Sequence, residues 1–207
     1  MTKFAIGGIQ MHLSMHNNMP EMKKRLAVMM HLYPWVEMVV FSELSHSGPN
    51  PASAQEMGGQ FETECQELAH KYGIWLIPGS YFEKGTDGAI YNTSPVINPA
   101  GEIVTRYRKI FLFTPYEEHS TPGSEICVFE VPSVGKFGMS ICYDIWFPEL
   151  TRSMVSQGAE VIINPVLASF IDRPADLAIV QASAAMFQSY VFSINGLMAG
   201  GNGYSRV

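Results

Sequence analysis

The sequence of 207 residues is long enough for one well-buried domain and too short for two of ordinary size. Hydrophobic residues make up 47% of it and charged residues only 15%. This composition excludes a disordered chain and favours a packed core, with part of the surface covered by another subunit. The net charge of −6 and the lack of a basic run give no reason to expect nucleic acid or an anionic membrane as a partner.

The N-terminus lacks the apolar core of a signal peptide, and no stretch of about 18 apolar residues is present, so we expect a cytoplasmic location. Three widely spaced cysteines without a C-x-x-C pair, Cys65, Cys127 and Cys142, are a poor framework for disulfides or zinc. The six histidines show no ligand spacing, so we expect no metal site. Gly7-Gly8 lacks the G-x-G-x-x-G spacing of a dinucleotide site.

Apolar periodicity and the positions of Pro and Gly predict the elements of the first half of the chain. We predict strands at 4–12, 37–43 and 75–83, helices at 19–34 and 61–73, and a Ser-, Gly- and Pro-rich loop at 45–59. Two strand-like runs follow within 89–109, around a turn at Asn98-Pro99-Ala100-Gly101 that predicts a hairpin.

The second half begins with a charged loop and then alternates strands with helices. We predict a loop at 110–125, two strands within 127–144, helices at 147–159 and 174–189, strands at 161–165 and 190–195, and the start of another strand at 203–207. Strands alternate with helices at both ends of the chain, with hairpins between them. This order predicts an α/β fold with a mixed sheet in a layered sandwich. No linker divides residues 1–207, so we expect a single domain, and because the chain ends inside a predicted strand, we expect it to be C-terminally incomplete.

Cys142 lies between a predicted strand and the helix that begins near Pro148. Open α/β sheets place their sites at such junctions, and N–H groups at a helix start stabilise a thiolate or an oxyanion. A small buried hydrophobic residue is the alternative, and position alone favours it. Packing explains Cys65 on a predicted helix and Cys127 at a strand start.

Glu43 and Lys109 also end predicted strands. A buried Glu43 would have the raised pKa of a general base, whereas a solvated strand end is the simpler interpretation. Lys109 closes the run TRYRK, which is typical of a basic edge strand but could also hold a developing oxyanion. Glu117 and Glu118 lie in the charged loop, where such a pair is usually plain surface.

Three strings resemble motifs of the carbon–nitrogen hydrolase (nitrilase) superfamily. They are VVFSE ending at Glu43, the hairpin AIYNTSPVINPAGEIVTRYRK ending at Lys109, and GMSICYDIWFPELTR around Cys142. The resemblance runs along nearly the whole chain, with the motifs in the order of the family. It implies a four-layer α-β-β-α sandwich of the nitrilase type, whose dimers pack helix against helix, with no metal or organic cofactor.

The resemblance also implies roles for individual residues. Glu43 is expected to act as general base and Cys142 as the nucleophile that forms a thioester, while Lys109 and the backbone N–H of Tyr143 hold the oxyanion. A second acid follows the lysine in many members, at Glu117 or Glu118 here, and we take Glu117. We place four side chains in substrate binding: Tyr143, Tyr116, Trp146 and His119.

The leading hypothesis is an enzyme, a homo-oligomer, that hydrolyses a non-peptide C–N bond in a small amide and releases ammonia and a carboxylic acid. Cys142-Tyr143-Asp144 resembles the amidase and carbamoylase branches, so N-carbamoyl amide hydrolysis is the alternative, and nitrile hydrolysis a less favoured one. A catalytically inactive binding protein on the same fold is the non-enzyme alternative. A Cys–His enzyme would need a histidine beside Cys142, and His119 is the nearest in sequence.

Overall fold

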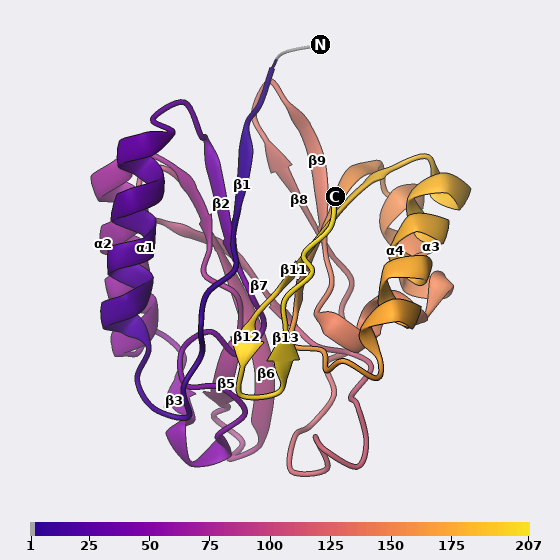
Figure 1. Ribbon diagram of the computed structural model, residues 1–207, viewed down its shortest axis with the longest axis horizontal. Coiled ribbons are helices and arrows are strands. Elements are labelled where there is room, and N and C mark those ends of the chain that lie inside the picture. Colours follow the sequence, from indigo (N-terminus) through magenta and orange to yellow (C-terminus); the bar gives the residue numbers. More distant parts are fainter. Residues whose placement is uncertain (1–2) are drawn as a thin grey trace.

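The computed structural model describes residues 3–207, in which two β-sheets pack face to face between two layers of helices (Figure 1). The first half of the chain forms one sheet with its covering helices, and the second half forms the other sheet with its own. The predicted four-layer α-β-β-α arrangement is therefore confirmed. None of the helices in the described part of the chain has the length and apolar character needed to cross a membrane.

The first sheet is mixed and has the strand order β1-β2-β4-β6-β5-β3, with β7 also paired to β6. Its strands are β1 (Ile6–Ile9), β2 (Met38–Phe41), β3 (Gln55–Glu56), β4 (Trp75–Ile77), β5 (Tyr81–Lys84), β6 (Ile90–Ile97) and β7 (Ile103–Arg108). Strands β1, β2 and β4 are parallel, whereas β6 runs antiparallel to β4, β5 and β7. The predicted turn at 98–101 joins β6 to β7, and Gly101 adopts the positive φ that this turn requires.

The second sheet has the order β11-β10-β9-β8. Its strands are β8 (Cys127–Val131), β9 (Gly135–Met139), β10 (Ala159–Val166) and β11 (Tyr190–Asn195). Strands β9, β10 and β11 are parallel, and β8 closes the sheet antiparallel to β9. A short hairpin follows that the sequence did not predict, formed by β12 (Leu197–Met198) and β13 (Gly201–Asn202).

The helices cover the outer faces of the sheets (Figure 1). The outer layers are α1 (Met19–Leu32) and α2 (Gln60–Tyr72) on one side, and α3 (Pro148–Ser156) and α4 (Arg173–Phe187) on the other. Two 3₁₀ turns, η1 (Pro51–Ser53) and η2 (Cys142–Trp146), lie in the connections. Pro stands in the first turn of α1, α3 and α4, and Gly73 caps α2 in the left-handed conformation, as expected for helix boundaries.

Alternating side chains of β2 divide the core into two clusters. Met38 and Val40 join the cluster between the two sheets, whereas Val39 and Phe41 pack toward α1 and α2. All four are essentially inaccessible to solvent, and burial of each is worth about 1.5–3 kcal/mol. A strand buried on both faces brings its C-terminal end into the interior, and Glu43 lies two residues beyond this end.

The prediction of one strand over 75–83 is wrong, because β4 and β5 are separate strands. Pro78 cannot donate a ladder hydrogen bond, and Gly79 has φ +80°. A Cβ on Gly79 would lie 1.8 Å from the carbonyl oxygen of Ser42, so only glycine lets the chain pass this close to the segment that carries Glu43.

Candidate active site

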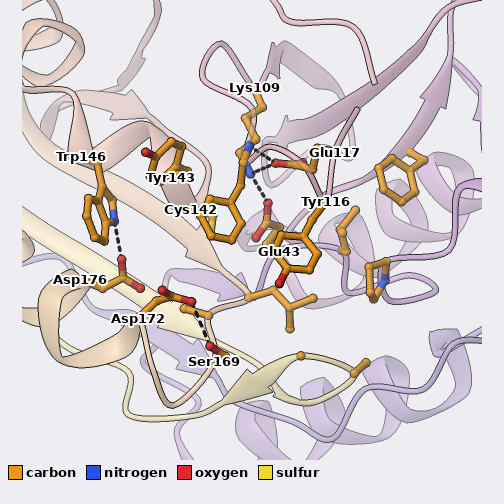
Figure 2. A pocket seen from close by; sticks show the side chains of 18 of the residues that line it. Glu43, Lys109, Tyr116, Glu117, Cys142, Tyr143, Trp146, Ser169, Asp172 and Asp176 are labelled. Atoms are coloured by element: carbon orange, nitrogen blue, oxygen red, sulfur yellow. Dashed lines mark hydrogen bonds and ion pairs between the residues drawn. The ribbon is translucent and has the colours of Figure 1, made fainter. Parts of the chain in front are cut away.

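Residues from both halves of the chain meet in one cavity of about 260 Å³. Glu43 lies two residues past β2 and Lys109 one residue past β7, while Cys142 opens the turn η2 after β9. Figure 2 shows these three side chains and Glu117 directed toward one another. The strand ends of the two packed sheets therefore deliver the predicted residues to a single place.

The Lys109 ammonium lies between two carboxylates (Figure 2). Its Nζ donates to Glu43 Oε1 at 2.8 Å and to Glu117 Oε2 at 2.6 Å, and all three side chains are buried. The Asn92 amide donates to the same two acids, at 2.9 and 3.0 Å, and the Phe113 N–H donates to Glu117 at 2.7 Å. Glu118, the other acid considered from the sequence, is exposed.

These contacts determine the charge states of Lys109 and Glu117. Burial opposes the charge of Lys109, but the attractions of Glu43, Cys142 and Glu117 outweigh it and raise the pKa of Lys109. Burial likewise works against the ionised Glu117, yet Lys109 outweighs it and the pKa of Glu117 is lowered. Lys109 is therefore a permanent cation beside the permanent anion Glu117.

For Glu43 and Cys142, by contrast, burial prevails over the neighbouring positive charge. Burial is the main cause that raises the pKa of Glu43, and Lys109 lowers it only in part. Burial, followed by the charge of Glu43, raises the pKa of the Cys142 thiol well above its usual range. The neighbouring Cys142 thiol lowers the pKa of Glu43, as Lys109 does, but burial outweighs both. The pair thus holds a protonated thiol against a carboxylate that is a stronger base than usual.

Cys142 has φ +49°, a left-handed conformation that costs of order 1–3 kcal/mol in a residue other than glycine. A buried hydrogen-bond cage around Asp144 maintains this turn. The Asp144 carboxylate accepts from Tyr107 Oη at 2.7 Å, Phe111 N at 2.8 Å and Ile141 N at 2.9 Å. Burial raises the pKa of Asp144 to about 6. These hydrogen bonds link β7, which ends one residue before Lys109, to the turn η2, which begins at Cys142.

The cavity is completed by aromatic and polar side chains that include the four predicted substrate-binding residues. Tyr116, His119, Tyr143 and Trp146 all line it. Phe113 contacts Tyr116 and Tyr143 with ring centroids 5.5 and 5.1 Å apart. Tyr116 remains 73% exposed, so it lies at the rim and not at the floor.

Several contributing residues were not predicted from the sequence. Asn92 appears in the sequence analysis only within the hairpin string. Counting back from the turn would pair it with Arg108, but a bulge near Val96 shifts the register, so that Asn92 lies opposite Lys109 and its carbonyl accepts from the Lys109 N–H at 2.9 Å. The resemblance of the hairpin string was therefore the one signal for Asn92. No comparable signal pointed to Asp172 and Asp176, which line the cavity from the start of α4. Within residues 3–207, no three His, Cys, Asp or Glu side chains gather in a way suited to a metal ion.

The interpretation of TRYRK as a solvated basic edge is wrong. Arg106 pairs with Glu62 at 2.8 Å, and Arg108 forms an ion pair with Glu83; both glutamates are buried. Because side chains alternate along β7, these arginines point away from the second sheet, while Tyr107 and Lys109 point toward it.

Comparison with known proteins gives a consistent result. The carbon-nitrogen hydrolase family profile matches residues 7–205. The chain is 32% identical over 145 residues to an omega-amidase of Xenopus tropicalis, a match that covers 66% of this chain and 52% of that protein. It is 32% identical over 152 residues to a human deaminated glutathione amidase, covering 67% of this chain and 46% of that one.

A solved structure shares the fold over nearly the whole chain. A nitrilase-superfamily protein of Saccharomyces cerevisiae superposes with a TM-score of 0.84 at 26% identity, and the match covers 95% of this chain and 79% of that one. The chain spans about half the length of the curated relatives it matches. The profile match along nearly all of its residues shows that this chain belongs to the carbon-nitrogen hydrolase family.

Proposed function

We propose that this protein hydrolyses the non-peptide C–N bond of a small amide through a thioester on Cys142. One observation carries the proposal: a buried ammonium, Lys109, bonds the carboxylates of Glu43 and Glu117 in a cavity that Cys142 also lines. An acid, a cation and a thiol in one water-poor cavity are the parts that covalent acyl transfer requires. The matched relatives named as amidases support the same chemistry.

In the first step the Cys142 sulfur bonds to the carbonyl carbon while Glu43 accepts the thiol proton. Burial raises the pKa of Glu43, which makes its carboxylate a stronger base toward this proton. The carbonyl oxygen becomes negative as its π bond opens. Lys109 Nζ and the Tyr143 N–H, near the start of the turn η2, are placed to stabilise this charge.

In the second step the tetrahedral intermediate collapses, and the C–N bond breaks. The proton held by Glu43 passes to the departing nitrogen, which leaves as ammonia or an amine, and an acyl thioester remains on Cys142. A water molecule then attacks the thioester and gives a proton to Glu43. The C–S bond breaks, the thiol regains its proton and the carboxylic acid leaves, so the overall reaction consumes one water.

Glu117 contributes through Lys109 and Asn92 and does not itself need to meet the substrate. Its carboxylate balances the charge of Lys109 and determines where the ammonium points. Because Glu117 has a lowered pKa, it remains an anion while Glu43 exchanges its proton. The pKa values of the two acids are shifted in opposite directions, so Glu43 acts as the base and Glu117 as the counter-ion of Lys109.

The direct test measures ammonia release from a panel of small amides and carbamoyl compounds, with Cys142→Ala as control. We expect the wild type to release ammonia from at least one amide and the alanine variant to release none above background. Carbon dioxide released together with ammonia would identify the carbamoyl alternative. Equal release by both proteins on every compound would exclude the hydrolase.

A thiol-labelling measurement separates the enzyme from an inactive binding protein. We expect mass spectrometry to find an acyl group on Cys142 after rapid quenching with substrate, and none on Cys65 or Cys127, which are buried in the core. Equal labelling of all three cysteines would favour the non-enzyme alternative.

A further inference from the structure

Two carboxylates that the proposed mechanism does not use lie on one wall of the cavity. Asp172 and Asp176 come from the start of α4, on the side of the cavity away from Lys109 (Figure 2). Ser169 Oγ donates to Asp172 Oδ2 at 2.9 Å, and Trp146 Nε1 donates to Asp176 Oδ1. Neighbouring side chains thus hold both acids in place.

Acidic residues near a helix start often stabilise the helix through its N–H groups. That role does not account for this pair, because the Asp172 side chain caps no backbone N–H of α4 and Asp176 is turned toward the indole of Trp146. Asp176 is only 5% exposed, and its second oxygen, Oδ2, has no hydrogen-bond partner in residues 3–207. The nearest cation to this oxygen is Arg173, whose Nη1 lies 3.6 Å away in an ion pair that is too long for a hydrogen bond.

The charges around the cavity are unbalanced. Its lining contains four carboxylates, on Glu43, Glu117, Asp172 and Asp176, and Lys109 is the one Lys or Arg that lines it among the described residues. Lys109 already forms ion pairs with Glu43 and Glu117.

Arg173 offsets the charge of Asp176, with which it forms an ion pair, but Asp172 has no ion-pair partner among residues 3–207. Arg173 lies outside the cavity lining, bonded to Ser193 Oγ and the Tyr204 carbonyl, with a guanidinium nitrogen 3.6 Å from Asp176 Oδ2. Burial, together with the like charge of Asp172, raises the pKa of Asp176 despite the opposing effects of Trp146 and Arg173.

Building on the proposed function, we propose that the cavity selects small amides that carry an ammonium group at the end remote from the scissile C–N bond. The amide lies against Cys142 and Lys109, and the ammonium lies against the acidic wall of Asp172 and Asp176. The aromatic rings of Trp146 and Tyr143, with centroids 5.5 Å apart, also line the cavity. A cation is attracted to such surfaces, whereas a carboxylate meets only like charge.

The test compares three amides of similar size: 5-aminopentanamide (cationic), hexanamide (neutral) and 4-carbamoylbutanoate (anionic). We expect kcat/KM to fall in that order, by about tenfold at each step, which corresponds to about 1.4 kcal/mol. The preference should weaken as ionic strength rises, because salt screens the partly exposed Asp172. Equal rates, or fastest turnover of the anionic amide, would overturn the proposal.

The variant Asp172→Asn tests whether the acidic wall causes the preference for the cationic amide. Because Asp172 is only partly buried, we expect this variant to fold and to lose about tenfold in the ratio of cationic to neutral kcat/KM. Glu130→Gln, which removes an exposed acid on β8, is the matched control and should leave the ratio unchanged. An unchanged ratio in Asp172→Asn would contradict the assignment.

Calorimetry on the Cys142→Ala variant tests the selection without turnover. We expect 5-aminopentanamide to bind at least about tenfold more tightly than hexanamide, and Asp172→Asn to abolish the difference. If no amide is hydrolysed but this binding preference is present, the proposed chemistry fails and the cation site stands. If amides are hydrolysed without any preference in rate or affinity, the cation site fails and the chemistry stands.

Discussion

Asn92 has a larger part in the site than its neutral side chain suggests. One amide nitrogen donates to both Glu43 and Glu117, and the backbone carbonyl of the same residue accepts from the Lys109 N–H. The hairpin between β6 and β7 therefore supplies the ammonium from one strand and its organising amide from the other. Hydrogen bonds to charged groups contribute about 1.5–3 kcal/mol each, so removal of this amide should disturb both acids.

We predict that Asn92→Ala lowers kcat on any amide that the wild type hydrolyses by about 10- to 100-fold, with a smaller change in KM. The two acids lose a shared donor, and the Glu43 carboxylate is no longer held toward the thiol. Steady-state kinetics provides the measurement. Asn98→Ala, at the other end of β6, removes turn hydrogen bonds and should lower stability without this loss of kcat. Equal kcat for Asn92→Ala and the wild type would contradict the prediction.

The second prediction concerns Asp144 and the dependence of folding stability on pH. Burial raises its pKa from 3.8 to about 6, so the folded state binds more protons than the unfolded state between these values. The contribution of Asp144 to stability therefore falls as pH rises through that window, by roughly 3 kcal/mol in total, and is constant above it. Denaturant unfolding of the wild type and Asp144→Asn from pH 4 to 7 measures the difference. If the difference does not change with pH, Asp144 does not titrate as inferred.

The hairpin β6–β7 shows what the sequence could and could not predict. Its turn, its strands and the position of Lys109 at its end follow from local pattern, because Asn-Pro-Ala-Gly suits few other conformations. The partners of Arg106 and Arg108 come from α2 and β5, which no local pattern places beside β7. The break between β4 and β5 did have a local signal, because a Pro-Gly pair such as Pro78-Gly79 is typical of a turn. Only the close approach of Gly79 to Ser42 needed the folded molecule to be seen.

The ion pair between Arg106 on β7 and Glu62 on α2 can be tested by mutation. Glu62 is almost fully buried and accepts from Arg106 and from Tyr81. We predict that Arg106→Ala lowers the free energy of unfolding by about 2–4 kcal/mol, because it leaves a buried carboxylate without its cation. Adding Glu62→Gln should restore part of the loss, and chemical denaturation of all four proteins gives the coupling. Strictly additive effects would show that the two side chains do not interact.

The four layers explain why strand-end residues from distant parts of the chain meet. The two sheets pack through one shared core, and the ends of β2, β7 and β9 approach the same region. The sequence predicted the layers from alternating elements and the resemblance, but not the acidic wall of Asp172 and Asp176, since those aspartates look like ordinary helix-start residues. Their position depends on how α4 packs against the turn that carries Cys142, which is a property of the assembled molecule.

The outer surface supports the proposal that the protein forms a homo-oligomer. Met186 on α4 and Tyr190 at the start of β11 are 62% and 64% exposed, and exposed apolar side chains of this kind are often covered by an interface. We predict a multiple of the 23.0 kDa chain mass in light scattering after size-exclusion chromatography. Met186→Glu should shift the protein toward the single chain, because burying a carboxylate in an apolar contact is unfavourable. Met57→Glu, at an exposed position in the turn between β3 and α2, should not. A wild type that elutes at 23.0 kDa at micromolar concentration would contradict the prediction.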